Sequence, residues 1–137
     1  MQKQNPVVEI VISKKIKTVH PLVESIITVL SNIDVIKFIR VTPDFIKASS
    51  EVTGTRIKTP ITEPGHPSAV GLSVVIEPDF KTIQFHELNS AQKGYGEQMV
   101  SSILSVLPDD WNGLVVMDYS DGFWDKMAIR YPNLEIL

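Results

Sequence analysis

The sequence predicts an α+β domain in which strands and helices alternate along 137 residues. The clearest strand lies at residues 70–76, where Val, Leu, Val and Ile alternate with other residues; turn residues follow, and 82–88 returns as the second strand of a hairpin. Apolar residues recur at helical spacing in 21–30 and 97–107. We therefore expect one domain over residues 1–137, with helices packed on a sheet.

Composition excludes several function classes. Net charge is −3, so nothing favours nucleic acid or an anionic membrane, and no apolar run approaches the roughly 18 residues that a membrane span needs. The chain has no cysteine, and its three histidines lack metal-ligand spacing. Residues 1–6 lack the apolar region of a secretory signal. We therefore expect a cytoplasmic protein without a metal.

The first half of the chain predicts two strands, two helices and a long loop. A strand is expected at 7–13, and His20-Pro21 opens a helix that ends near Asn32. The apolar run 34–41 favours a strand because of its β-branched residues. Thr42-Pro43 resembles a cap and a first helical residue, which predicts a short helix over Pro43–Val52. Prolines and a glycine make 58–68 a surface loop.

The second half predicts a helix, a buried strand, a further helix and a short last strand. The helix 97–107 is stopped by Pro108. The continuous apolar run 114–117 is typical of a strand that is buried on both faces. A last helix, capped by Ser120 or Asp121, carries apolar residues four positions apart, and 134–137 forms the terminal strand.

The segment Gln92-Lys93-Gly94-Tyr95-Gly96, between a strand and a helix, predicts a phosphate cradle. The first N–H groups of a helix have no intrahelical partner, and the helix dipole makes that end electropositive. Gly94 lets the main chain approach a ligand and can adopt positive φ. Glu97 excludes a Walker loop, which needs Lys and Ser/Thr there, and Met99 excludes the third glycine of a dinucleotide fingerprint.

From Ala91 to Gly96 the chain resembles the GNAT superfamily of N-acetyltransferases, in which a strand, the pattern Arg/Gln-x-x-Gly-x-Gly/Ala and a helix follow one another. Both glycines match, whereas Ala91 replaces the Arg or Gln and Gln92 comes one position late. The motif lies within 87–107, and the resemblance is topological over 1–68. It implies an α/β (α+β) fold with a mixed, mostly antiparallel central sheet and helices on both faces.

The resemblance implies that acetyl-CoA is the co-substrate, with its pyrophosphate on the amides of 92–96 and its pantetheine near Leu88. It implies direct transfer of acetyl to a primary amine, on a small molecule or a protein, without a metal. Glu87 is the candidate base, and its place beside Ile83 and Phe85 would bury it partly and raise its pKa. Family members often place a tyrosine acid where this chain has Trp124, so Tyr119 and Ser120 are the substitute candidates.

Each of these assignments has an alternative. Glu87 could be a structural hydrogen-bond acceptor, and the glycines could form an ordinary turn. We therefore carry three hypotheses: an N-acetyltransferase, a catalytically impaired acetyl-CoA-binding module that acts through a protein partner, and an interaction domain without a cofactor. A homodimer is compatible with the first two.

Overall fold

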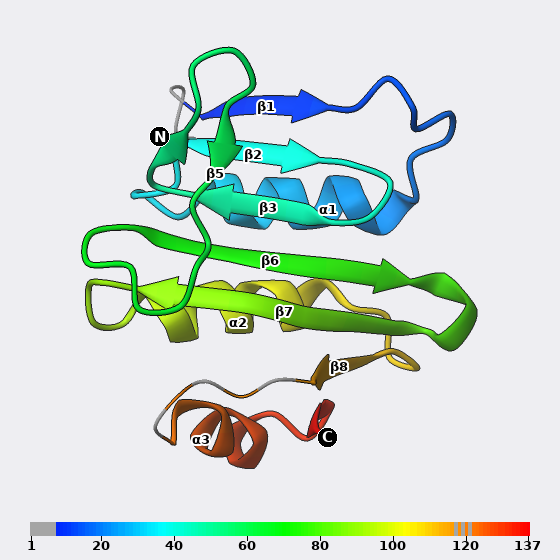
Figure 1. Ribbon diagram of the computed structural model, residues 1–137. Helices are drawn as coiled ribbons and strands as arrows, with labels where there is room; N and C mark the ends of the chain where they lie inside the picture. The colour runs from blue at the N-terminus through cyan, green and yellow to red at the C-terminus, as the bar shows by residue number, and fades with distance from the viewer. Residues whose placement is uncertain (1–7, 117, 119, 121) are drawn as a thin grey trace, which may run out of the picture.

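The computed structural model describes residues 8–116, 118, 120 and 122–137, which form a seven-stranded sheet, a two-stranded ribbon and three helices (Figure 1). The sheet has the order β1-β2-β3-β6-β7-β8-β9. Its strands are β1 (Glu9–Ile12), β2 (Phe38–Val41), β3 (Ile46–Ser49), β6 (Val70–Glu77), β7 (Thr82–Ser90), β8 (Asn112–Val115) and β9 (Leu134–Ile136). The ribbon pairs β4 (Val52–Thr53) with β5 (Thr59–Pro60), and the helices are α1 (Pro21–Ser31), α2 (Tyr95–Val106) and α3 (Phe123–Arg130).

The sheet is mixed, which confirms the coarse α+β class. The neighbouring pairs β2–β3, β3–β6 and β6–β7 are antiparallel. The pairs β1–β2, β7–β8 and β8–β9 are parallel. One hydrophobic cluster joins side chains of the helices to the central strands, with Ile26, Leu72, Phe85 and Met99 among its buried members. None of the described helices has the length and apolar character that crossing a bilayer requires.

Helix α1 begins and ends where local chemistry predicts. His20 is the N-cap, and its Nδ1 accepts the N–H of Leu22 at 3.1 Å, while Pro21 occupies the first helical position. Asn32 is the C-cap. The face that α1 buries carries Leu22, Val23, Ile26 and Leu30, so the spacing read from the sequence is the one that packs on the sheet.

All three helices lie on one face of the sheet in the described part of the chain, so the prediction of helices on both faces is wrong. Helices α1 and α2 contact each other behind the central strands (Figure 1). Helix α3 joins them because Arg130 pairs with Glu97 of α2 and the Trp124 ring lies 5.4 Å from Phe85. The connections β7-α2-β8 and β8-α3-β9 advance in the same direction between parallel strands, and right-handed crossovers then place both helices on one face.

Residues 50–69, which include the β4–β5 ribbon, cross part of the other face of the sheet (Figure 1). β5 contacts β2 and β3, and the loop after it reaches β7, where Thr62 bonds Glu87 and Gly65 bonds Asn89. Much of the predicted loop 58–68 is therefore irregular, as expected, but it is also packed against the strands.

The helix expected over Pro43–Val52 is wrong. Thr42 Oγ1 accepts the N–H groups of Asp44 and Phe45 at 3.2 Å, and Thr42 N–H bonds to Phe45 O, so Thr42-Pro43 forms a strand-to-strand turn. Residues 46–49 then pair with β2 on one side and β6 on the other. Two ladders and the burial of Ile46 and Ala48 override the local helix signal.

A bulge in β7 positions the site. Ser73 pairs with Glu87 and the next residue, Val74, pairs with Phe85, so His86 is left without a partner on β6. Because the extra residue reverses the alternation, Glu87 points to the face opposite Phe85 and Ile83. The expectation that Glu87 shares a side with these two residues is therefore wrong.

Candidate functional site

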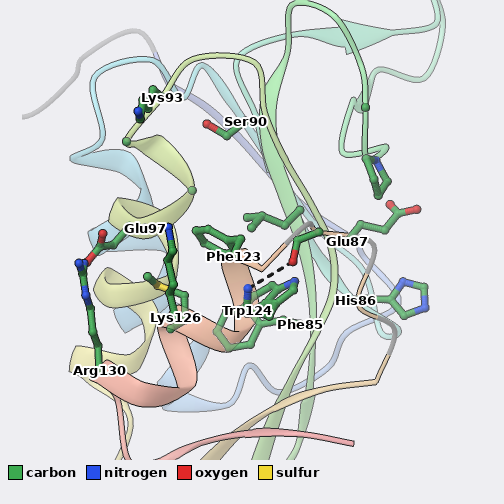
Figure 2. A pocket seen from close by; sticks show the side chains of 17 residues that line it. Phe85, His86, Glu87, Ser90, Lys93, Glu97, Phe123, Trp124, Lys126 and Arg130 are labelled. Carbon is green, nitrogen blue, oxygen red and sulfur yellow. Dashed lines mark hydrogen bonds and ion pairs between the residues drawn. The ribbon is translucent and has the colours of Figure 1, made fainter.

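A cavity of about 530 Å³ opens where β7 and β8 separate. The two strands pair in parallel from Thr82–Asn112 to Phe85–Val115, whereas β7 continues to Ser90 with no described strand on that side. The cavity occupies the space beside this free length of β7. Its lining comes from β7, the start of α2, one face of α3 and the loop after β5 (Figure 2).

The cavity extends past both faces of β7. Phe85 and Leu88 line it from the helix face, whereas Pro64 and Gly65 line it from the loop that covers the opposite face. Glu87, also in the lining, points to that opposite face. The cavity lining therefore includes residues on both faces of β7.

The start of α2 is an uncapped helix terminus at one end of the cavity. Gly94 is the N-cap with φ +97°, and no described side chain caps the helix. The first bond within the helix runs from the Gln98 N–H to the Gly94 carbonyl at 3.2 Å. The N–H groups of residues 95–97 precede that bond and have no acceptor within the helix, so they can bind an anion.

Four of the six residues predicted to bind a cofactor line the cavity: Leu88, Lys93, Gly94 and Gly96. Gln92 and Tyr95 are not among the residues that line it. The Tyr95 hydroxyl instead donates a hydrogen bond to Asp34 Oδ1 at 2.8 Å, and this bond, with some desolvation and the nearby negative charge, raises the tyrosine pKa above its usual value. Tyr95 therefore ties the start of α2 to the turn that follows α1.

Gly96 allows two helices to approach each other. A Cβ built on it would lie 3.3 Å from the Phe123 ring of α3 and 3.7 Å from Leu88. Its absence lets Phe123 pack against the first turn of α2, and this contact closes one wall of the cavity. The second glycine of the motif thus serves the packing of α3 against the first turn of α2.

The candidate catalytic residues have structural partners. Thr62 donates a hydrogen bond from its hydroxyl to Glu87 Oε1. Ser120 lines the cavity, but its hydroxyl donates to Asp118 Oδ1 at 2.6 Å and accepts the N–H of Trp124 at 3.2 Å. The N-cap of α3 is Gly122, so the prediction that Ser120 caps this helix is wrong, although its hydroxyl bonds an N–H of the first turn. Tyr119, like the alternative cap Asp121, lies outside the described residues.

Trp124, at the position where a tyrosine acid was considered, belongs to the core. It is 4% exposed, and its ring packs on Phe85 and edge-on to Phe123 at 5.1 Å. These three rings form the apolar middle of the cavity (Figure 2). The middle of the cavity therefore suits an uncharged part of a ligand.

Sequence reasoning missed the contribution of α3. Its residues Phe123, Trp124, Met127 and Arg130 line the cavity, as does Lys126. Their spacing of three and four positions is a signal present in the sequence, since it places them along one side of a helix. From the sequence, this helix was expected only to carry apolar residues four positions apart. Lys126 and Arg130, which lie beside these apolar residues, were not expected to line the same site as the glycine turn.

The loop wall of the cavity is held by a buried amide. Asn89 is 6% exposed, and its Oδ1 accepts the N–H of Gly65 at 3.1 Å. Its Nδ2 donates to the carbonyls of His66 and Ala69 at 3.1 and 2.6 Å. His66 Nδ1 in turn accepts the N–H groups of Ser68 and Ala69 at 3.3 and 3.1 Å. All three of these side-chain polar atoms bond to the backbone of the loop.

Within the described part of the chain, no three His, Asp or Glu side chains lie together as metal ligands would. The arrangement offers backbone amides and cations at one end, aromatic rings in the middle, and a carboxylate and a histidine beyond the bulge. In comparisons with protein-family models, with curated proteins and with solved structures, nothing matches this chain.

Proposed function

We propose that this chain binds acetyl-CoA in the cavity between β7, α2 and α3 and transfers its acetyl group to a primary amine, as in the GNAT superfamily. The observation that carries the proposal is the free edge of β7, which borders the cavity between an uncapped helix terminus and an aromatic cluster. The helix terminus suits the pyrophosphate of an acyl-CoA, the free edge of β7 suits the amide groups of its pantetheine arm, and the aromatic cluster suits the apolar parts of that arm.

The pyrophosphate would bind at the start of α2. Phosphate oxygens accept hydrogen bonds from helix N-terminal amides, and Lys93 lines the same end of the cavity without an ion pair to any described residue. The positive φ of Gly94 turns the chain into the helix at this point.

The pantetheine arm would lie along β7. Its amide groups need donors and acceptors, and the main chain of β7 from His86 to Ser90 has no described strand beside it on the cavity side. Phe85, Phe123 and Trp124 would cover the apolar parts of the arm. The thioester would then reach the gap beyond Val115, where an amine could approach from the side of Glu87 and His86.

In the reaction, the amine nitrogen attacks the thioester carbonyl carbon, the C–N bond forms and the C–S bond breaks. The nitrogen loses a proton to a base, and the CoA thiolate leaves and takes up a proton. Glu87 is the candidate base: its Oε1 accepts the Thr62 hydroxyl, and its Oε2 would take up the proton of the amine. Ser120 and Tyr119 are the candidate acids, or the thiolate leaves without one.

A second candidate, an acetyl-CoA-binding module with impaired catalysis, is favoured by specific contacts. Thr62 already occupies a Glu87 carboxylate oxygen, the Ser120 proton is committed to Asp118, and Trp124 provides no exchangeable acid. Such a module would bind acetyl-CoA and act by contacting a protein partner.

Ligand binding tests both candidates. At a concentration 100 times Kd, acetyl-CoA should add about 2.7 kcal/mol to the free energy of unfolding, which raises Tm by roughly 8 °C in a domain of this size. Replacing Lys93 by Glu should weaken binding tenfold or more, since a bond to a charged group contributes about 1.5–3 kcal/mol.

Lys14→Glu is the matched control, because Lys14 is exposed in the turn after β1, far from the cavity. An unchanged Tm at millimolar acetyl-CoA would rule out both candidates. Where binding is found, release of CoA thiol with a panel of amines separates them: thiol release that requires an amine identifies the enzyme, and its absence identifies the binding module.

A further inference from the structure

Helix α3 carries two cations on the side that borders the cavity. Lys126 and Arg130 are four residues apart, so they lie next to each other on the helix surface. The residues between them and the sheet, Trp124 and Met127, are buried. The cavity wall formed by α3 is therefore apolar toward the sheet and cationic at its rim, as Figure 2 shows for Trp124, Lys126 and Arg130.

The charges at this rim do not balance. Arg130 forms an ion pair with Glu97 of α2, whereas Lys126 has neither an ion pair nor a side-chain hydrogen bond with any described residue. Two like charges at this spacing on a helix repel each other. Among the described residues that line this rim, one carboxylate for two cations leaves an excess positive charge.

These cations lie at a different level of the cavity from the start of α2. Glu97, which Arg130 contacts, is three residues beyond the N-cap Gly94, or about 4.5 Å further along the helix axis. Lys93 lies on the other side of the N-cap (Figure 2). The site therefore offers one anion position at the helix terminus and a second position between α2 and α3.

We propose that Lys126 and Arg130 form a second phosphate subsite, which binds the ribose 3′-phosphate of CoA. This inference rests on the proposed function, because it assigns the second phosphate of the same ligand. On binding, Arg130 exchanges Glu97 for the phosphate, which a guanidinium can contact through two parallel N–H bonds, and Lys126 adds a point charge. Glu97 then limits affinity, because it competes with the ligand for Arg130.

The test compares CoA with 3′-dephospho-CoA, which differ by this one phosphate, by titration calorimetry at a fixed ionic strength. The intact protein should bind CoA about tenfold more tightly, the effect expected of one charge-assisted hydrogen-bonded contact. Lys126→Gln should weaken CoA severalfold and leave dephospho-CoA unchanged, so that the preference shrinks. Glu97→Gln should strengthen CoA by a smaller factor.

Lys14→Gln is the matched control, and a thermal melt of each unliganded variant checks that the fold is retained. Equal affinity of the intact protein for the two ligands would overturn the subsite and leave the proposed function in place. An equal loss of affinity for CoA and for dephospho-CoA in Lys126→Gln would overturn it in the same way. Binding of neither ligand would overturn the subsite and the proposed function together.

Discussion

The two ends of the cavity differ in whether their polar groups already have partners within the fold. At the α2–α3 end, the first helical amides have no acceptor within the helix, and Lys93 and Lys126 have no ion pair among the described residues. At the loop end, Glu87, Asn89 and the His66 ring all hold hydrogen bonds within the fold.

This difference separates binding groups from structural groups. A donor at a cavity wall without a partner costs free energy unless water or a ligand satisfies it, whereas a bonded group has already met its requirement. The α2–α3 end should therefore control ligand affinity, and the loop end should control stability. Substitutions at the two ends should separate these two properties.

Asn89→Leu should have the largest effect, and it should act on stability. The substitution removes the Asn89 partner of the Gly65 N–H and of the His66 carbonyl, and one of the two partners of the buried Ala69 carbonyl, which keeps the Ala91 N–H. We expect the free energy of unfolding to fall by about 2–4 kcal/mol, measured by urea denaturation. Acetyl-CoA affinity of the protein that remains folded should change little.

Asn112→Leu is the control for Asn89→Leu, since the Asn112 side chain is exposed at the start of β8 and its change should cost little. A small cost for Asn89→Leu, similar to that of the control, would show that the loop is held by other contacts. A large loss of acetyl-CoA affinity would show that the loop belongs to the binding end.

Gly94→Ala and Gly65→Ala compare the two ends at equal backbone cost. Both glycines have positive φ, +97° and +85°, and at both positions a Cβ would meet no atom within 4 Å. Each substitution should therefore lower stability by about 1 kcal/mol through the backbone alone. Only Gly94→Ala should weaken acetyl-CoA binding, because it disturbs the amides at the start of α2.

Urea unfolding and calorimetry on the two glycine variants measure both quantities. Equal losses of affinity in Gly94→Ala and Gly65→Ala would mean that the ends do not differ in function. A loss confined to Gly65→Ala would place the phosphate at the loop end and reverse the assignment.

The sequence predicted the parts of the fold that local rules determine. Periodicity located α1, α2, α3 and the β6–β7 hairpin, and the glycine turn was placed correctly before a helix. His20-Pro21 and Asn32 carried enough capping chemistry to mark both ends of α1. These signals work because each acts within one or two turns of the chain.

The errors share a different cause. Thr42-Pro43 is compatible with a helix start and with a turn, and only the strands on either side of residues 46–49 decide between them. The bulge at His86 has no local marker, yet it moves Glu87 to the other face of β7. Lys126 and Arg130 join the site through packing of α3 against Gly96, which depends on contacts distant in sequence.

Tyr95→Phe should have the smallest effect and sharpens the comparison within the glycine motif itself. Tyr95 follows Gly94, but its hydroxyl bonds to Asp34 outside the cavity, so acetyl-CoA affinity should not change. The bond raises the pKa of Tyr95 in the folded protein, so its stabilising effect is present below the unfolded pKa of about 10 and is lost as pH rises through the folded value.

Urea unfolding of the parent chain and of Tyr95→Phe at pH 8 and at pH 11 or above measures this dependence. The parent should be slightly more stable at pH 8, and the difference should shrink at the higher pH, where deprotonation removes the donor and places a second negative charge beside Asp34. Tyr131→Phe controls for tyrosine ionisation elsewhere. A difference that grows with pH would contradict the assigned bond, and a loss of acetyl-CoA affinity would return Tyr95 to the binding end.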